Sequence, residues 1–473
     1  MAAAEEVKFS LKVVMIKGRN KVLYAEIDSD FADVILSFLT FPLGTIARLF
    51  IKHYGNTPIL GSLNSLYAGL FNLDGSHFGT EAGRLMLLNP RNASQFLCST
   101  LKLQIDDTPP IKFFACRTHK CVSVYYKMRC LCPDSTINEI WIDDFFQYLF
   151  RSGNGSVFTA KTTTFVLTDD LEMLINSPAS IFQILRRNFI EDANTLEEKT
   201  LIVGLKEIME LLKASLVSKT PLTDMVLPTR TMAATLDGRT KYIAPAKYES
   251  DALPRTRTQT SQNMSSNSKK INVKAFVQKS SSRVLLAQSR HDFIDFLFSM
   301  LTIPLGRVQF LLGENTCGGS IHNLYRSISN SETANYMKAT TRLLEPLLPQ
   351  GYLSLNRIFS LKEELPPSHY KGILGPLPIP AKSWIDPKGK GSFVKEARTL
   401  FVVTDDLVVS TPSSISIIST LNQMKIPISD VEERELGIGM EEASSILQAS
   451  LTSTYALTNG LKPFLKRQPK QEK

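Results

Sequence analysis

Hydrophobic and polar positions at the start of the chain predict a β-hairpin followed by a helix. The segment KFSLKVVMIKGRNKVLYAEI (residues 8–27) reads as two strands joined around residues 17–20, where glycine and asparagine suit a tight turn. Ser29 or Asp30 then fits a helix N-cap, because apolar residues at helical spacing follow over residues 31–39.

The phrase Leu-Thr-x-Pro-Leu-Gly closes this region and occurs twice, ending at Gly44 and at Gly306. Aligning residues 21–44 with residues 283–306 at an offset of 262 gives 12 identities in 24 positions. Unrelated segments would share roughly one or two. Proline ends or kinks one helix and suits the first turn of the next, and glycine relieves crowding. We interpret the phrase as an elbow between packed helices; a binding role is the weaker alternative.

The duplication extends over whole domains. GSLNSLY (residues 61–67) matches GSIHNLY (residues 319–325), and FVLTDDL (residues 165–171) matches FVVTDDL (residues 401–407). The offset has then fallen to 236, so the second copy is 26 residues shorter in its middle. We therefore predict two homologous domains and expect each to fold alone.

The remaining elements of each copy complete an α+β fold class. FVLTDDL reads as a strand that runs into an acidic turn, SPASIFQIL as a short helix, and EEKTLIVGLKEIMELLKASL as a longer helix. The predicted boundaries are a first repeat at 7–227, a linker at 228–270, a second repeat at 271–461 and a tail at 462–473.

The linker and the tail account for the basic character of the chain. The net charge is +9, of which residues 228–270 contribute +5 and residues 461–473 contribute +4. Residues 228–270 are polar and serine-rich, so we expect a flexible, basic linker. Contact of this linker with RNA, DNA or anionic lipid is the alternative to a solvated tether.

An apolar stretch at residues 293–313 is about long enough to cross a bilayer, but it carries Asp295, Pro304 and Arg307. Central charges are penalised by roughly 2.5–3.5 kcal/mol each, so we predict a buried amphipathic segment and no membrane span. The first ten residues resemble neither a secretory signal nor a transit peptide. The expected location is cytoplasmic or nuclear.

A cluster of cysteines is the sharpest chemical candidate. Cys116, Cys121, Cys130 and Cys132 have the spacing Cys-x4-Cys-x8-Cys-x-Cys on what reads as strand, turn and strand, with His119 as a spare ligand. Four thiolates suit a structural zinc ion. Ordinary reduced thiols are an equal alternative, since a Cys-x-Cys pair is an uncommon zinc ligand, and a disulfide or redox role is a third.

The duplicated aspartate pairs, Asp169-Asp170 and Asp405-Asp406, suggest either paired acid–base groups or structural caps. Neighbouring strand residues point to opposite faces, so an acidic turn or helix cap is favoured. The chain contains no phosphate-binding loop, His-Glu-x-x-His, nucleophile elbow or kinase signature. We therefore predict no catalytic residues.

The duplicated blocks KVLYAE, FxDxxxSFLTxPLG, SLY and VLTDDL together resemble those of the plant-specific domain-of-unknown-function family 674. The resemblance spans residues 7–463 apart from the linker. It implies a plant origin and an intracellular protein, and it implies no particular activity, cofactor or catalytic residue.

The leading functional hypothesis is a non-enzymatic intracellular protein that acts through contacts with protein partners. Two linked modules engage two partners, or one partner twice. The alternative is a zinc-stabilised nucleic-acid-binding protein, and an enzyme with an unrecognised site is third.

Overall fold

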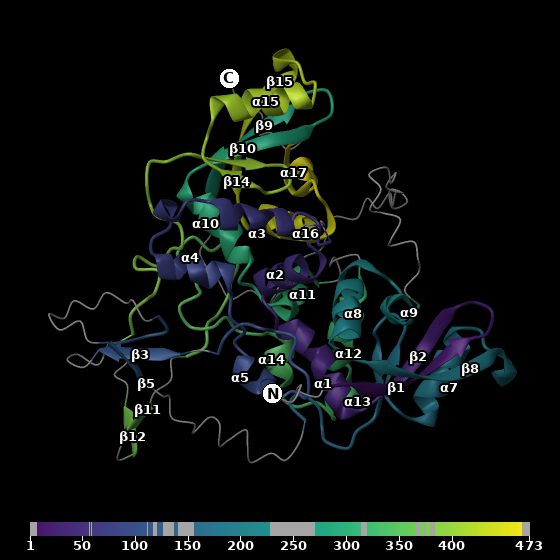
Figure 1. The fold of residues 1–473 in the computed structure, drawn as a ribbon. Coiled ribbons are helices and arrows are strands. Elements are labelled where there is room, and N and C mark those ends of the chain that lie inside the picture. The colour runs from purple at the N-terminus through teal and green to yellow at the C-terminus, as the bar shows by residue number, and fades with distance from the viewer. Residues whose placement is uncertain are drawn as a thin grey trace, which may run out of the picture. The chain divides into compact units, whose positions relative to one another are not determined.

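The computed structural model describes residues 7–55, 57, 59–110, 112–116, 121–125, 137–140, 156–227, 270–313, 319–365, 369–372, 375–378 and 384–465. The linker at 228–270 thus lies outside the described residues apart from Lys270, and so does the tail beyond Leu465. The fold is α+β, as predicted, and Figure 1 shows its helices and antiparallel strands.

The first repeat contributes one five-stranded sheet, in the order β7-β6-β2-β1-β8. The strands are β1 (Phe9–Ile16), β2 (Lys21–Ile27), β6 (Phe165–Thr168), β7 (Met173–Ile175) and β8 (Leu196–Val203), and all neighbours are antiparallel. The predicted hairpin is confirmed: Gly18 and Asn20 have φ angles of 73° and 44°, which the tight turn between β1 and β2 requires.

The second repeat contributes a sheet with the equivalent order, β14-β13-β10-β9-β15. Its strands are β9 (Ile271–Gln278), β10 (Arg283–Ser289), β13 (Phe401–Thr404), β14 (Val409–Ser410) and β15 (Val431–Ile438), again antiparallel. The sequence duplication therefore corresponds to two sheets of the same topology.

The chain forms two compact units, and each unit draws segments from both repeats. Unit 1 comprises residues 1–36, 158–267 and 309–340; unit 2 comprises residues 37–157, 268–308 and 341–473. We expected each repeat to fold alone, whereas each compact unit contains segments of both repeats. The boundaries of the repeats along the sequence stay a prediction.

Unit 1 surrounds the first sheet with helices. They are α1 (Ser29–Ser37), α7 (Pro178–Arg187), α8 (Leu205–Val217) and α9 (Pro221–Val226) from the first repeat, and α12 (Ile321–Ser329) and α13 (Ser331–Ala334) from the second. The ring of Phe31 on α1 meets that of Phe9 on one face of the sheet at 5.2 Å. On the other face, α7 packs through Ile184 against Tyr24 and Val166.

Unit 2 contains the second sheet and a larger set of helices, which also come from both repeats. The first repeat supplies α2 (Leu43–Tyr54), α3 (Leu63–Asn72), α4 (Glu81–Leu88) and α5 (Gln95–Cys98). The second supplies α10 (His291–Met300), α15 (Ser414–Gln423), α16 (Met440–Thr452) and α17 (Ala456–Leu465). Helices α11 (Leu305–Leu312) and α14 (Thr340–Leu344) contain the division between the units.

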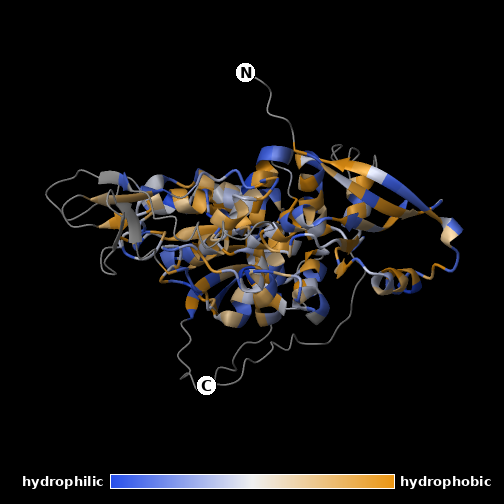
Figure 2. Cartoon of the chain, turned by 90° about the horizontal axis from the view of Figure 1, so that it is seen from below, coloured by the Kyte–Doolittle hydropathy of each residue, from blue (hydrophilic) through white to orange (hydrophobic). Residues whose placement is uncertain are grey.

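Short elements complete the described chain. They are the sheets β4-β3-β5 (Val122–Ser123, Phe113–Cys116, Ile137–Ile140) and β11-β12 (His369–Gly372, Gly375–Pro378), and the 3-10 turns η1 (Phe38–Thr40), η2 (Gly75–His77), η3 (Ala193–Thr195) and η8 (Ile428–Asp430). Figure 2 shows hydrophobic and hydrophilic residues interleaved along strands and helices, as amphipathic elements require.

The two Pro-Leu-Gly elbows pair with each other inside unit 2. Pro42 and Pro304 form an antiparallel bridge. The Gly44 amide donates to the Leu301 carbonyl at 2.7 Å, and the Leu305 amide donates to the Phe41 carbonyl at 2.9 Å. A Cβ on Gly44 would lie 3.0 Å from that Leu301 oxygen, so glycine is needed where one elbow meets the other. The prediction of a geometric role is confirmed, and the crowding at Gly44 comes from both repeats, since Pro90 of the same repeat would lie 2.9 Å from that Cβ.

Two predictions about helices are wrong. The segment at residues 197–203, expected to begin a long helix, belongs to strand β8 (Leu196–Val203), and the helix starts only at Leu205 after Gly204. β8 pairs with β1 along its whole length, and this pairing outweighs the local helical preference of its glutamates and lysine. The cap of α1 is Asp28, whose Oδ1 accepts from the Phe31 amide at 2.8 Å, rather than Ser29 or Asp30.

The apolar stretch at residues 293–313 divides into α10 and α11 at the second elbow. Asp295 is fully buried and Arg307 nearly so, which fits the predicted buried segment. Within the part of the chain that the structure describes, no helix has the length and apolar character needed to span a bilayer.

Candidate functional site

The first aspartate of each TDDL motif fastens a C-terminal helix to the sheet. In unit 1, Asp169 accepts from the Thr223 amide at 2.8 Å and from the Thr223 hydroxyl at 2.9 Å. The same hydroxyl accepts from the Val22 amide on β2 at 2.9 Å. Asp169 therefore caps α9 and links it to β2. Burial raises the pKa of Asp169 to about 6.

Unit 2 repeats this arrangement. Asp405 accepts from the amide and the hydroxyl of Thr458 on α17, both at 2.8 Å, and the Val284 amide donates to that hydroxyl at 2.9 Å. Arg283 adds an ion pair at 3.3 Å. Burial raises the pKa of Asp405, and the Arg283 guanidinium opposes that shift.

The second aspartates do not join the first in an acid–base pair. Asp170 accepts from the Thr168 hydroxyl at 2.6 Å, and Asp406 accepts from the Thr404 hydroxyl in the same way. In each pair, the first aspartate thus caps a helix and the second stabilises the tight turn after the strand. The structural interpretation of the four aspartates is confirmed by these contacts.

A further duplicated pair of buried aspartates has the same kind of role. Asp33 in unit 1 accepts at one oxygen from the amides of Phe158 and Thr159, at 3.0 and 2.9 Å. Asp295 in unit 2 accepts from the amides of Phe393 and Val394, at 2.7 and 3.0 Å. Asp33 lies in the FxD phrase of the sequence, where no role was predicted for it. The signal was present, since a charged residue recurs in an apolar helix of both repeats.

Two of the four predicted zinc ligands lie together. Cys116 ends β3, its amide donates to the Cys121 carbonyl at 3.0 Å, and both cysteines are in the reduced state. Burial and the neighbouring Cys116 raise the pKa of the Cys121 thiol, which favours its protonated form. Cys130, Cys132 and His119 lie outside the described residues. Among the residues that the structure describes, no group of three or more His, Cys, Asp or Glu side chains is placed to hold a metal ion.

Polar side chains converge on one hollow of about 200 Å³ in unit 2. It is lined by Trp384, Glu363 and the loop that carries Lys388, among others. The Lys388 ammonium is buried, donates to the Gly351 carbonyl, and pairs with Asp386 at 3.0 Å. Asp386 balances the charge of the Lys388 ammonium, and the hydrogen bond to Gly351 links the loop of Lys388 to a second loop.

The second sheet also contains an apolar cavity of about 170 Å³ beneath α15, lined by Phe276, Leu286 and Leu421 among others. At the position of Leu286 the first repeat has Tyr24, whose ring belongs to the packed cluster beneath α7. The two repeats therefore fill this interface differently.

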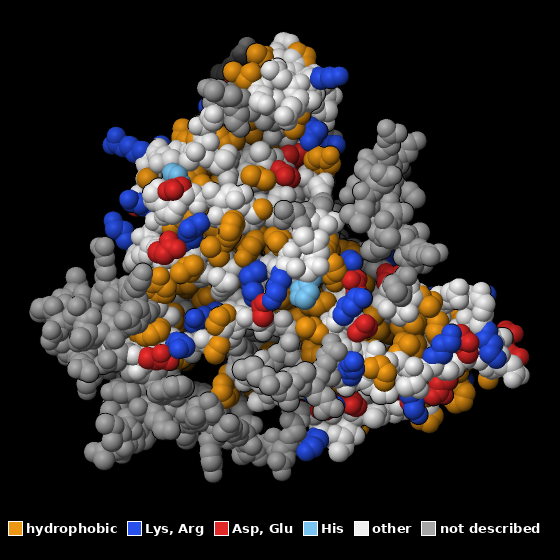
Figure 3. All heavy atoms as spheres, viewed as in Figure 1, with side chains coloured by type: hydrophobic (Ala, Val, Ile, Leu, Met, Phe, Trp, Pro, Cys, Tyr) orange, Lys and Arg blue, Asp and Glu red, His pale blue; other side chains and the backbone are white. Residues whose placement is uncertain are grey.

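Exposed hydrophobic side chains recur on the outer side of α7 and α15 and in the segments that follow these helices. The first apolar patch consists of Phe182 and Phe189, which are 59% and 90% exposed. The second apolar patch consists of Ile418, Met424 and Ile428, which are 58%, 36% and 81% exposed. Hydrophobic side chains reach the surface in the region of α7 and β8 in Figure 3.

Phe189 is unusual in its backbone as well as its exposure. Its φ angle is +55°, in the left-handed region that bulky residues avoid. Lys425 takes the equivalent turn in the second repeat, with a φ angle of +54°. A phenylalanine in this turn combines local strain with a solvated ring.

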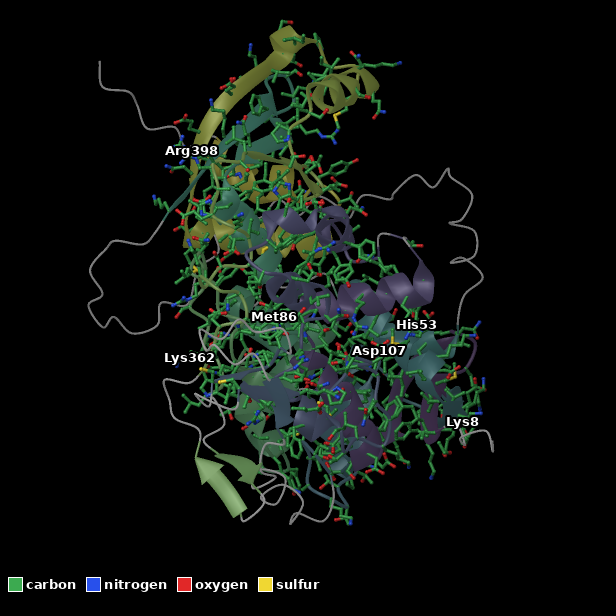
Figure 4. The ribbon with its side chains drawn as sticks, turned by 60° about the vertical axis from the view of Figure 1, so that its left-hand side comes forward. Lys8, His53, Met86, Asp107, Lys362 and Arg398 are labelled. Atoms are coloured by element: carbon green, nitrogen blue, oxygen red, sulfur yellow. The ribbon has the colours of Figure 1, made fainter. Side chains whose placement is uncertain are left out.

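Charged side chains of the described surface are paired and mixed in sign. Arg48 and Lys52 on α2 bind Asp107 at 2.5 and 2.6 Å, and Figure 4 shows Asp107 in the same region as His53, the next residue along α2. Acidic and basic groups both appear on the face drawn in Figure 3.

Comparison with protein families gives one match. A family model described as "Protein of unknown function (DUF674)" matches residues 5–441 and, separately, residues 381–473. The second match fits a domain that is present twice. Comparison with the curated proteins and with the solved structures finds no match.

Proposed function

The chain belongs to the DUF674 family of proteins of unknown function, and we propose that it works as a non-enzymatic protein that binds protein partners through its two apolar patches. The observation that carries this proposal is Phe189. Its ring is 90% exposed and its backbone is left-handed, and both features disfavour the free protein. Burying such a ring in a partner's pocket contributes roughly 1.5–3 kcal/mol.

Helix α7 has an inner face and an outer face with separate roles. Ile184 is buried against the sheet, with Ile181 and Leu185 packed beside it. Phe182 projects from the outer face and remains exposed. The ring is therefore not needed to attach α7 to its own sheet, and it is available to a partner.

Charges of both signs lie beside the first apolar patch. Glu191 and Asp192 lie two and three residues after Phe189, Arg186 and Arg187 end α7, and all four are exposed. Such a mixed rim suits a protein partner with complementary charges at the edge of its apolar pocket.

The test is affinity purification of the tagged full chain from plant tissue, with plant tissue chosen because of the proposed plant origin. We expect a reproducible partner with the wild type and its loss with Phe182→Glu/Phe189→Glu. Phe71→Glu is the matched control, since Phe71 is 63% exposed on α3 and belongs to neither patch. Identical recovery with the wild type and the double variant would contradict the proposal, provided circular dichroism shows the variant to be folded.

A zinc-stabilised nucleic-acid-binding protein is the second candidate, favoured by the adjacent Cys116 and Cys121 and by the basic linker and tail. Cys130 and Cys132 would complete the ligand set, and zinc would supply a structural cross-link. A protein that neutralises several phosphates loses affinity steeply between low and physiological salt. If binding to RNA and DNA is undetectable even at low salt, this candidate is excluded.

A further inference from the structure

Helices of the second repeat complete the sheet of the first. Strand β7 meets α12, where the Met173 amide donates to the Ser327 hydroxyl at 2.9 Å. The side-chain amide of Asn323 donates to the Asp170 carbonyl at 2.9 Å. The Ala160 amide donates to the Tyr336 carbonyl at 2.8 Å. All these contacts lie within unit 1, yet each joins residues more than 150 positions apart in the sequence.

The first repeat supplies the reciprocal helices to unit 2. The Ser62 amide donates to the Ser450 carbonyl at 2.9 Å, and the Ser62 hydroxyl donates to the Ser453 carbonyl at 2.7 Å. The Gly79 amide donates to the Phe393 carbonyl at 2.8 Å. We call residues 61–79 and 319–337 the first and second arms. Each arm lies on the sheet or C-terminal helix of the opposite repeat.

Equivalent residues make equivalent contacts in the two exchanges. Ser320 donates to the Ser218 carbonyl at 2.9 Å, as Ser62 does to Ser453. Gly61 and Gly319 precede these serines, and a Cβ on either would lie less than 3.0 Å from the backbone at the end of α16 or α8. The conserved spacing within the GSLNSLY and GSIHNLY phrases is therefore explained by a close approach to the other repeat.

We propose that each repeat is a mutual-exchange module whose arm-binding surface fits one kind of partner, a second repeat of the same type. In this chain the partner is the other half of the same polypeptide. The two halves are joined by the exchanged arms and the paired elbows, and the connector at residues 228–269 is not required to hold them. The arm-binding surface is specific because an arm fits it only when its glycine, its serine hydroxyl and its apolar helix face all lie in the matching register.

The experiment uses the full chain with a protease site inserted between Tyr248 and Glu249. The protein is folded, cleaved and analysed by size-exclusion chromatography and native mass spectrometry. We expect the two fragments to stay together in a 1:1 complex with the mass of the uncut protein. Elution of two separate, folded fragments would overturn the proposal.

A second measurement distinguishes exchange from simple adhesion of two complete domains. The cleaved fragments are separated in urea and refolded, alone or mixed. A mixed sample that regains the native circular dichroism, while each fragment alone unfolds without cooperativity or forms a homodimer, supports exchange. A fragment that refolds alone to a cooperative monomer contradicts it, because such a fragment needs no arm from another repeat.

Discussion

Removal of the Asp33 carboxylate is expected to destabilise the protein strongly, because two buried amides depend on it. Asp33 Oδ1 accepts from the amides of Phe158 and Thr159 and from the Thr159 hydroxyl. Both amides belong to residues with no exposed surface. In Asp33→Ala no solvent can replace the lost acceptor.

The magnitude follows from the two unsatisfied donors. Each costs roughly 1–3 kcal/mol, so Asp33→Ala should lower the free energy of unfolding by about 2–6 kcal/mol. With a urea slope of about 3 kcal/mol/M, the midpoint should fall by about 0.7–2 M. Asp33→Asn keeps an acceptor oxygen in place and should lose about 1–2 kcal/mol, the difference between a charged and a neutral hydrogen bond.

Asp30→Ala is the control, because Asp30 lies on the same helix and is exposed. Its cost should stay below about 1 kcal/mol. The assay is urea unfolding followed by circular dichroism. If the free energies of unfolding of Asp33→Ala and Asp30→Ala agree within about 1 kcal/mol, the buried carboxylate does not hold the segment at residues 158–159 and the reasoning fails.

Three further predictions concern other contacts. The raised pKa of Asp169 favours the protonated form in the folded state, so its contribution to stability is full below about pH 4 and falls as the pH rises through about 6. In Asp169→Asn this loss of stability with rising pH should be absent. In the wild type it lowers the free energy of unfolding by on the order of 3 kcal/mol at most, and urea unfolding between pH 4 and 7 measures it. Gly306→Ala should destabilise by about 2 kcal/mol or more, since a Cβ would meet the Leu343 carbonyl at less than 3.0 Å. If Cys116 and Cys121 take part in a zinc site, untagged reduced protein should contain about one zinc per chain by elemental analysis.

Each of these predictions has its own control. A wild type and an Asp169→Asn variant with parallel pH profiles would show that burial does not shift this carboxyl. Gly75→Ala places a Cβ at ordinary contact distance and should be tolerated, so equal losses at Gly75 and Gly306 would refute the steric argument. A zinc content near zero would exclude the metal site.

The local elements were predictable from the sequence because their signals are local. Gly18 and Asn20 mark the hairpin, and the spacing of apolar residues marks α1 and α7. Strand β8 was mistaken for helix because Glu197, Glu198 and Lys199 favour helix, whereas pairing with β1 depends on a strand about 180 residues away.

The exchange of arms was not predictable in this way. Two homologous domains that keep their own arms and two that exchange them have the same sequence repeats, since the same glycine and serine contacts form in either case. Gly61 and Gly319 indicate a close approach, and they carry no information about which repeat supplies the opposing backbone. The same limit applies to Asp33, whose hydrogen-bond donors come from a segment about 125 residues later.

The sequence predicted that Asp169 would cap a helix or stabilise a turn, but it did not indicate which helix. An acidic pair after a strand indicates a cap or turn, and both are present. The capped helix is α9, more than 50 residues further along the chain. Local sequence identifies a carboxylate that lacks partners nearby, but only the fold identifies the helix that it meets.

The most direct test of the exchange is hydrogen exchange in full-length Gly319→Ala. Gly319 belongs to the second repeat, yet its Cβ would meet the backbone of Ser215 and Leu216 at the end of α8 in the first. The account predicts faster amide exchange in α8 of the first repeat, with α16 of the second repeat unchanged. Faster exchange confined to α16, with α8 unaffected, would contradict it.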